Sequence, residues 1–126
     1  MGLIAYSQDK TKSGKRLLEI VKGGASDHKL EIYASIDGLT ERLHQPLMDV
    51  SVAVLHAATH SELMDMIYLG NLLSELRVVL VLPDSEPEAL EKAHMLHPRF
   101  IASAENDFKH LGSVLKRMME LYDKTD

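Results

Sequence analysis

Short apolar runs alternate along the chain with longer amphipathic stretches. The runs recur about every twenty to thirty residues, and each precedes a segment whose apolar positions have helical spacing. They are residues 3–6, 30–34, 52–55, 78–82 and 100–102. The run VVLVL at 78–82 is wholly apolar, as expected of a strand that is covered on both faces. The alternation predicts βα units that build a parallel sheet with helices on both sides.

Two helix starts carry the pattern of a capping box, in which a hydroxyl side chain accepts a hydrogen bond from a free amide of the first turn. Thr59 with Glu62 is one such pair, and Ser85 with Glu88 is the other. Both pairs predict that a helix begins at that point.

Other residues predict where helices end. Gly23 and Gly24 are expected to end the first helix, because glycine adopts the left-handed conformation at low cost. Pro46 lacks an amide hydrogen and should end or kink a short second helix. The third helix is predicted over about 60–76, and the last over about 107–122.

The third predicted helix carries two apolar stripes. One has the spacing of a core-facing stripe and consists of Leu63, Met66, Ile67, Gly70 and Leu73. The other lies on a flank and consists of Met64, Tyr68 and Leu72 at four-residue spacing. A deeply embedded helix and a protein-binding face both explain the second stripe, since large exposed apolar patches are uncommon on monomers.

Composition narrows the class of protein. A chain of 126 residues with 45% hydrophobic content fits one domain with one core, so residues 1–126 are expected to form a single domain. It has no signal-like start and no apolar run long enough for a bilayer, which favours a soluble, cytoplasmic protein without membrane contact. The absence of cysteine excludes disulfides and thiol catalysis. A net charge of -5 and the absence of tryptophan argue against nucleic-acid binding.

The segments MDVSVAVLHAATHSEL and RVVLVLPDSEPEALEKAH, with the final amphipathic helix, resemble the receiver domains of two-component response regulators. The resemblance extends over nearly the whole chain and rests on element order, lengths and apolar pattern, without a diagnostic motif. It implies a flavodoxin-like, three-layer α/β/α sandwich with a five-stranded parallel sheet of order 2-1-3-4-5.

The residues that carry out phosphorylation in receivers are replaced in this chain. The resemblance implies an acidic pair after strand one, a phosphate-accepting aspartate after strand three, a hydroxyl residue after strand four and a lysine after strand five. The corresponding positions hold Tyr6-Ser7-Gln8-Asp9, His56, Pro83 and Ser103. Without clustered acids the chain is not expected to hold Mg²⁺. We therefore expect a pseudo-receiver that is not phosphorylated on aspartate and has no cofactor, metal site or catalytic residue.

His56 stands where a buried strand meets a helix, at the edge where parallel α/β proteins place their chemistry. In this position His56 would be the phosphate acceptor of a phosphohistidine or, together with His60, a metal ligand. No H-E-x-x-H arrangement accompanies it, however. The simpler interpretation is a turn histidine that hydrogen-bonds to the backbone.

The segment YSQDKTKSGKR at 6–16 is the best candidate for ligand chemistry, because it opens a helix whose first amides could meet an anion. It does not match a Walker P-loop, and its likeness to the phosphate loop of flavodoxins is faint. The candidate ligand-binding residues are Ser7, Asp9, Thr11, Ser13, Lys15 and His56.

Two classes of function remain. The first is a signalling or scaffolding module that binds a protein partner or a second copy of itself. Its candidate surfaces are Met64, Tyr68 and Leu72 on the third helix and, by the resemblance to receivers, Leu90, His94 and Met95 with the region 109–116. The alternative is a protein or enzyme that binds a phosphate-containing ligand or a flavin at the loop after strand one.

Overall fold

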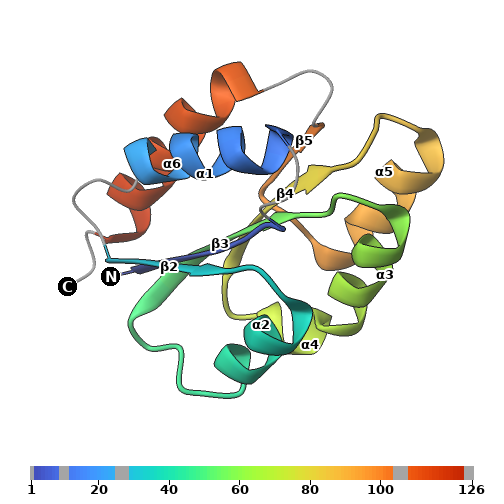
Figure 1. The fold of residues 1–126 in the computed structure, drawn as a ribbon. Coiled ribbons are helices and arrows are strands. Elements are labelled where there is room, and N and C mark those ends of the chain that lie inside the picture. Colours follow the sequence, from blue (N-terminus) through green and yellow to red (C-terminus); the bar gives the residue numbers. More distant parts are fainter. Residues whose placement is uncertain (1, 9–11, 25–28, 104–107, 124–126) are drawn as a thin grey trace.

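The computed structural model describes residues 2–8, 12–24, 29–103 and 108–123. Five parallel strands form one sheet in the order β2-β1-β3-β4-β5 (Figure 1). The strands are β1 (Gly2–Tyr6), β2 (Lys29–Tyr33), β3 (Val50–His56), β4 (Arg77–Leu82) and β5 (Phe100–Ser103). The predicted apolar runs and the predicted sheet order are confirmed.

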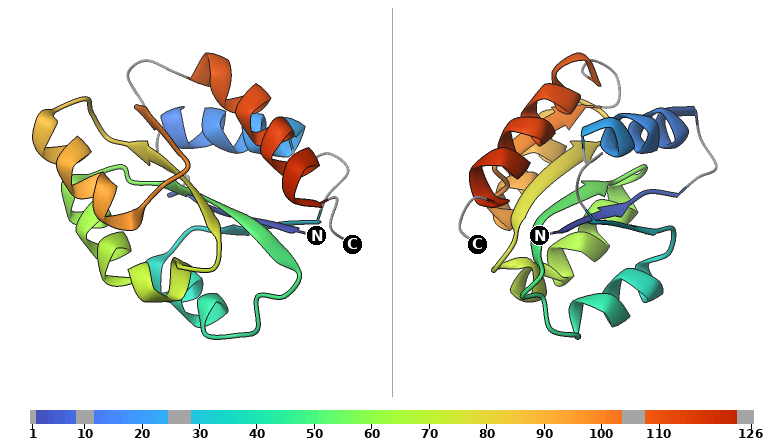
Figure 2. Two further views of the ribbon diagram at one scale, coloured as in Figure 1. Left: turned by 180° about the vertical axis from the view of Figure 1, so that it is seen from behind. Right: turned by 90° about the vertical axis from the view of Figure 1, so that its left-hand side faces the viewer.

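Helices cover both faces of the sheet. On one face lie α1 (Lys12–Gly24) and α6 (Phe108–Asp123). On the other lie α2 (Ile36–Leu43), α3 (His60–Tyr68), α4 (Gly70–Leu73), α5 (Pro87–Ala93) and the 3-10 turn η1 (His94–Leu96). Figure 2 shows the same two layers from other sides. Within the described part of the chain, no helix has both the length and the apolar character needed to cross a membrane.

The pleat of the strands divides the core into two halves. On β1, Leu3 and Ala5 pack toward α1 and α6, whereas Ile4 and Tyr6 pack toward the opposite layer. All residues of β3 are buried, as are all but the first of β4. Double coverage is the physical reason that these runs are continuously apolar instead of alternating.

The predicted third helix is interrupted, so the prediction of one helix over about 60–76 is wrong. α3 ends at Tyr68, Leu69 leaves helical geometry with ψ near 2°, and α4 begins at Gly70. Glycine weakens a helix interior by about 1 kcal/mol relative to alanine. Leu69, at the break, and Leu73, in α4, both lie in the core.

For one of the two predicted capping boxes, the predicted N-cap hydrogen bond is confirmed. Thr59 Oγ1 accepts from the amide of Glu62 at 3.1 Å and caps α3. The prediction for Ser85 is wrong, because α5 begins later, at Pro87, with no side-chain cap. Proline suits the first helical position, where no amide hydrogen is needed.

We expect Thr59→Ala to lower the free energy of unfolding by about 1 kcal/mol, because an amide of the first turn of α3 loses its acceptor. Urea denaturation followed by circular dichroism measures the loss. Ser85→Ala is the matched control, since the Ser85 hydroxyl caps no helix, and it should stay within about 0.5 kcal/mol of the parent. Equal losses in the two variants would contradict this account.

Candidate functional site

The carboxyl ends of β1 and β3 meet at the centre of the sheet. Tyr6 pairs with Leu55, which brings Ser7 beside His56 at the end of β3. Ser7 Oγ and His56 Nδ1 lie 2.9 Å apart and share a hydrogen bond. The two residues are 0% and 2% exposed, so the pair is sealed from solvent. The expectation of a turn histidine that hydrogen-bonds to the backbone is wrong, because the ring of His56 hydrogen-bonds to the buried side chain of Ser7.

A second buried pair joins β1 to α3. The Tyr6 hydroxyl donates to Glu62 Oε2 at 2.5 Å, and the amide of Ala58 donates to Glu62 Oε1 at 3.1 Å. Burial raises the pKa of the Tyr6 phenol, and the hydrogen bond to Glu62 raises it further. Both carboxyl oxygens of Glu62 are thus engaged in holding the start of α3 against the end of β1.

Burial also sets the charge state of His56. It lowers the pKa of the imidazole, because the cation would lose its hydration, and the charge of Glu62 offsets only part of this effect. A neutral imidazole beside a hydroxyl is the pairing that activates a serine nucleophile in hydrolases. Here no substrate can reach the hydroxyl, because Ser7 is fully buried.

The candidate ligand-binding residues are only partly placed. Ser7 and His56 are brought together, whereas Lys15 is exposed on α1. Asp9, Thr11 and the side chain of Ser13 lie outside the described residues. Anion binding by the loop after β1 therefore stays a prediction.

Sequence reasoning missed the part played by Tyr6 and Glu62. The spacing of Thr59 and Glu62 indicated a helix start and nothing about a contact with β1. In the structure Glu62 turns inward and is 7% exposed. A polar aromatic residue at the end of a buried strand was the available signal, because a buried Tyr hydroxyl needs a hydrogen-bond partner.

His60 belongs to a different, outer group. Its Nε2 lies 2.8 Å from Asp84 Oδ2, which links the start of α3 to the segment between β4 and α5. This hydrogen bond raises the pKa of His60 and lowers the pKa of Asp84. His56 and His60 therefore have different partners despite their four-residue spacing.

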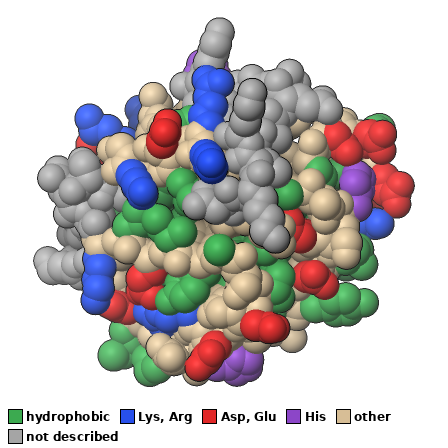
Figure 3. Space-filling model, in the orientation of Figure 1, with side chains coloured by type: hydrophobic (Ala, Val, Ile, Leu, Met, Phe, Trp, Pro, Cys, Tyr) green, Lys and Arg blue, Asp and Glu red, His purple; other side chains and the backbone are tan. Residues whose placement is uncertain are grey.

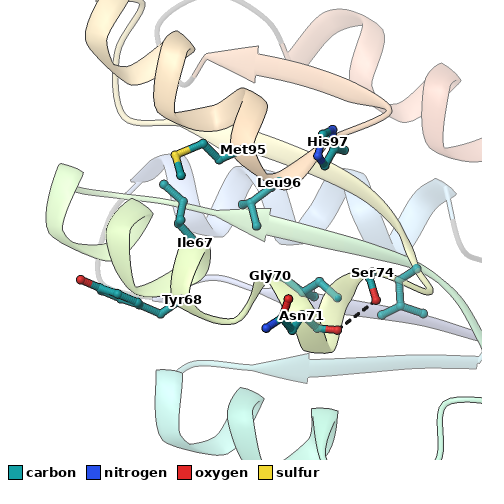
Figure 4. A pocket seen from close by; sticks show the side chains of 10 residues that line it. Ile67, Tyr68, Gly70, Asn71, Ser74, Met95, Leu96 and His97 are labelled. Atoms are coloured by element: carbon teal, nitrogen blue, oxygen red, sulfur yellow. Dashed lines mark hydrogen bonds between the residues drawn. The ribbon is translucent and has the colours of Figure 1, made fainter.

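Two of the candidate surface residues, Tyr68 and Met95, meet in one groove between α3, α4 and η1. Tyr68 is 80% exposed and Met95 is 63% exposed, and both line a cavity of about 380 Å³. In Figure 4 the Met95 side chain points toward Ile67 across the groove, while the Tyr68 ring extends outward at its edge. Leu96 and His97 form part of the opposite wall, and His97 takes the left-handed conformation with φ 48°. We call this feature the Tyr68–Met95 groove.

The other candidate surface residues lie elsewhere. Leu72 is half-buried and lines a separate cavity with Leu43 and Leu47. Leu90 lines another, with Asp84 and others near the end of β5. The remaining two are Met64, which is half-buried, and His94, which is exposed. In the region 109–116, α6 lies on the opposite face of the sheet from the groove.

Comparison with known proteins identifies the fold. No protein-family model matches the chain, and no curated protein does. Among solved structures it is similar to a pilus assembly-related protein of Burkholderia pseudomallei, with 20% identity, TM-score 0.69 and coverage of 95% of this chain and 90% of that one. It is similar to a CheY-like receiver domain of Methanospirillum hungatei, with 9% identity, TM-score 0.71 and coverage of 99% and 98%.

A third similar structure is an orphan response regulator of H. pylori, with 8% identity, TM-score 0.68 and coverage of 95% of this chain and 94% of that one. The chain therefore has the fold of response-regulator receiver domains. At these identities the likeness establishes the fold alone, and the chemistry has to be argued from the residues of this chain.

Neutral His56 should make the fold sensitive to acid. Its pKa in the folded chain lies below its ordinary value of 6.5, so the unfolded chain takes up the proton first as the pH falls. The stability that depends on the neutral ring is present above that ordinary value and is lost as the pH drops below it. We expect His56→Asn, which keeps a neutral polar group beside Ser7, to lose less stability than the parent between about pH 7 and about pH 5.

Urea denaturation at a series of pH values tests this expectation. His60 and the other titrating groups are common to both proteins, so the difference between the two stability profiles isolates position 56. Parallel profiles would show that His56 does not carry the acid sensitivity.

Proposed function

We propose that this chain is a receiver-fold interaction module that works without aspartyl phosphorylation. The observation that carries the proposal is the sealed Ser7–His56 pair at the carboxyl ends of β1 and β3. In a receiver that edge must present carboxylates to a magnesium ion and a phosphate donor. Here it presents a hydrogen bond between two buried side chains.

The electrostatics of this edge support the proposal. Phosphoryl transfer needs a metal ion to neutralise the charge that develops on the phosphoryl oxygens, and Mg²⁺ is held through oxygen ligands. Residues 50–60 contain no Asp or Glu. The nearby buried acid, Glu62, already accepts hydrogen bonds at both oxygens. The end of β3 therefore offers no free carboxylate to a hard cation.

We further propose that the Tyr68–Met95 groove is the working surface and that it binds a protein. Tyr68 and Met95 expose a large aromatic ring and a flexible thioether beside an apolar wall. Aromatic and methionine side chains are enriched in protein interfaces, where they bury much area at modest cost in rotamer freedom. Exposed residues of this kind around one concave site favour a contact surface over a solvated one.

We expect no phosphoryl adduct when the chain is incubated with acetyl phosphate and Mg²⁺, and no change in its amide spectrum when beryllofluoride replaces the phosphate donor. The reason is the lack of an exposed acid at the end of β3. Intact-mass spectrometry and NMR make the two measurements, with a phosphorylatable receiver domain in parallel as the positive control. An adduct that forms on this chain and disappears in Asp9→Asn would overturn the proposal.

We expect Tyr68→Asp to weaken association through the groove at least tenfold, or about 1.4 kcal/mol, because a carboxylate would have to be desolvated in the contact. Light scattering over a concentration series measures self-association, and a photocrosslinker at position 68 detects other proteins. Met48→Asp is the control, since Met48 is 89% exposed and does not line the groove.

A chain that stays monomeric and gives no crosslink at position 68 would contradict the groove as a working surface. Equal effects of Tyr68→Asp and Met48→Asp would do the same, because they would reflect added charge instead of a lost contact.

A further inference from the structure

Three potential metal ligands converge outside both the groove and the sealed pair. His60 Nε2, a carboxyl oxygen of Asp84 and a carboxyl oxygen of Glu86 all lie within 4.8 Å of one another. His60 begins α3, whereas Asp84 and Glu86 precede α5, so the donors come from two separate segments. Acidic side chains and a histidine gather on the side of the molecule where α3 and α5 lie (Figures 1 and 3).

We propose that this cluster binds a divalent transition-metal ion of the Zn²⁺ type. Zn²⁺ accepts both imidazole nitrogen and carboxylate oxygen as ligands, so one imidazole and two carboxylates would supply three of its four positions and leave the fourth for water. Mg²⁺ prefers all-oxygen, near-octahedral surroundings, so the imidazole selects against it. The cluster is thus different in ligand chemistry from a magnesium site.

The spacing of the donors requires only small movements. Ligands at about 2.1 Å from a tetrahedral zinc ion lie about 3.4 Å apart. His60 Nε2 and Asp84 Oδ2 are 2.8 Å apart and would separate slightly as the metal replaces the proton between them. Glu86 is exposed, so its side chain can swing in without disturbing the core.

Asp84 is already oriented for such a contact. Its Oδ1 accepts from the amide of Glu86 at 3.1 Å, which leaves Oδ2 directed at His60. A ligand held by a second hydrogen bond loses less freedom when the metal binds. A bound ion would tie the start of α3 to the start of α5 across the carboxyl edge of the sheet.

Isothermal titration with Zn²⁺ tests the site, with Mg²⁺ titrated in parallel. We expect Zn²⁺ to bind the parent chain, Mg²⁺ to give no signal, and His60→Gln and Glu86→Gln each to weaken zinc binding at least tenfold. His44→Gln is the control, because His44 is also exposed but lies just after α2, where its ring contacts the carbonyl oxygen of Thr40. It should bind zinc like the parent.

Melting curves give a second readout, since zinc should raise the melting temperature of the parent and of His44→Gln but not of His60→Gln. Circular dichroism checks that each variant is folded. Equal zinc affinity in the parent and in His60→Gln, or an equal loss in His44→Gln, would overturn the proposal. Tyr68→Asp should leave zinc binding unchanged, so the proposed metal site is tested independently of the proposed groove.

Discussion

The pairing of β1 with β3 at the centre of a doubly covered sheet is the constraint on which the rest of the molecule depends. A polar side chain at the end of either strand is cut off from water and must find a partner within the protein. Ser7 with His56, and Tyr6 with Glu62, meet that requirement. Leaving one such group unpaired costs about 1–3 kcal/mol. The burial that makes these contacts valuable also keeps reactants away from them.

Much of the fold could be predicted from the sequence because double coverage forces the central strands to be continuously apolar. The strand order, by contrast, came from the resemblance to receivers and not from the pattern itself. Predictions failed where two local signals competed. Around Gly70, the helical spacing of apolar residues continued across the break at Leu69, so the spacing gave no sign of it. Near Ser85, a capping pattern lost to Pro87, which starts the helix two residues later.

The candidate site could be predicted less well, because its contacts join distant parts of the chain. His56 was recognisable as the end of a buried strand, but its partner Ser7 is 49 residues away. Glu62 is 56 residues from Tyr6, and nothing in the capping pattern indicated that its carboxyl group turns inward. The groove poses the same difficulty, since Tyr68 and Met95 come from elements separated by a strand.

The buried Glu62, held by Tyr6, limits which substitutions could give this chain a phosphate-accepting aspartate. Exchanging His56 for aspartate alone would set a second acid within reach of the charge of Glu62, in surroundings that penalise ionisation. The aspartate introduced at position 56 would favour its protonated form, which is not nucleophilic. A chain that accepts phosphate on aspartate would therefore need several substitutions together, on β1, β3 and α3. A single substitution at position 56 would not give it that chemistry.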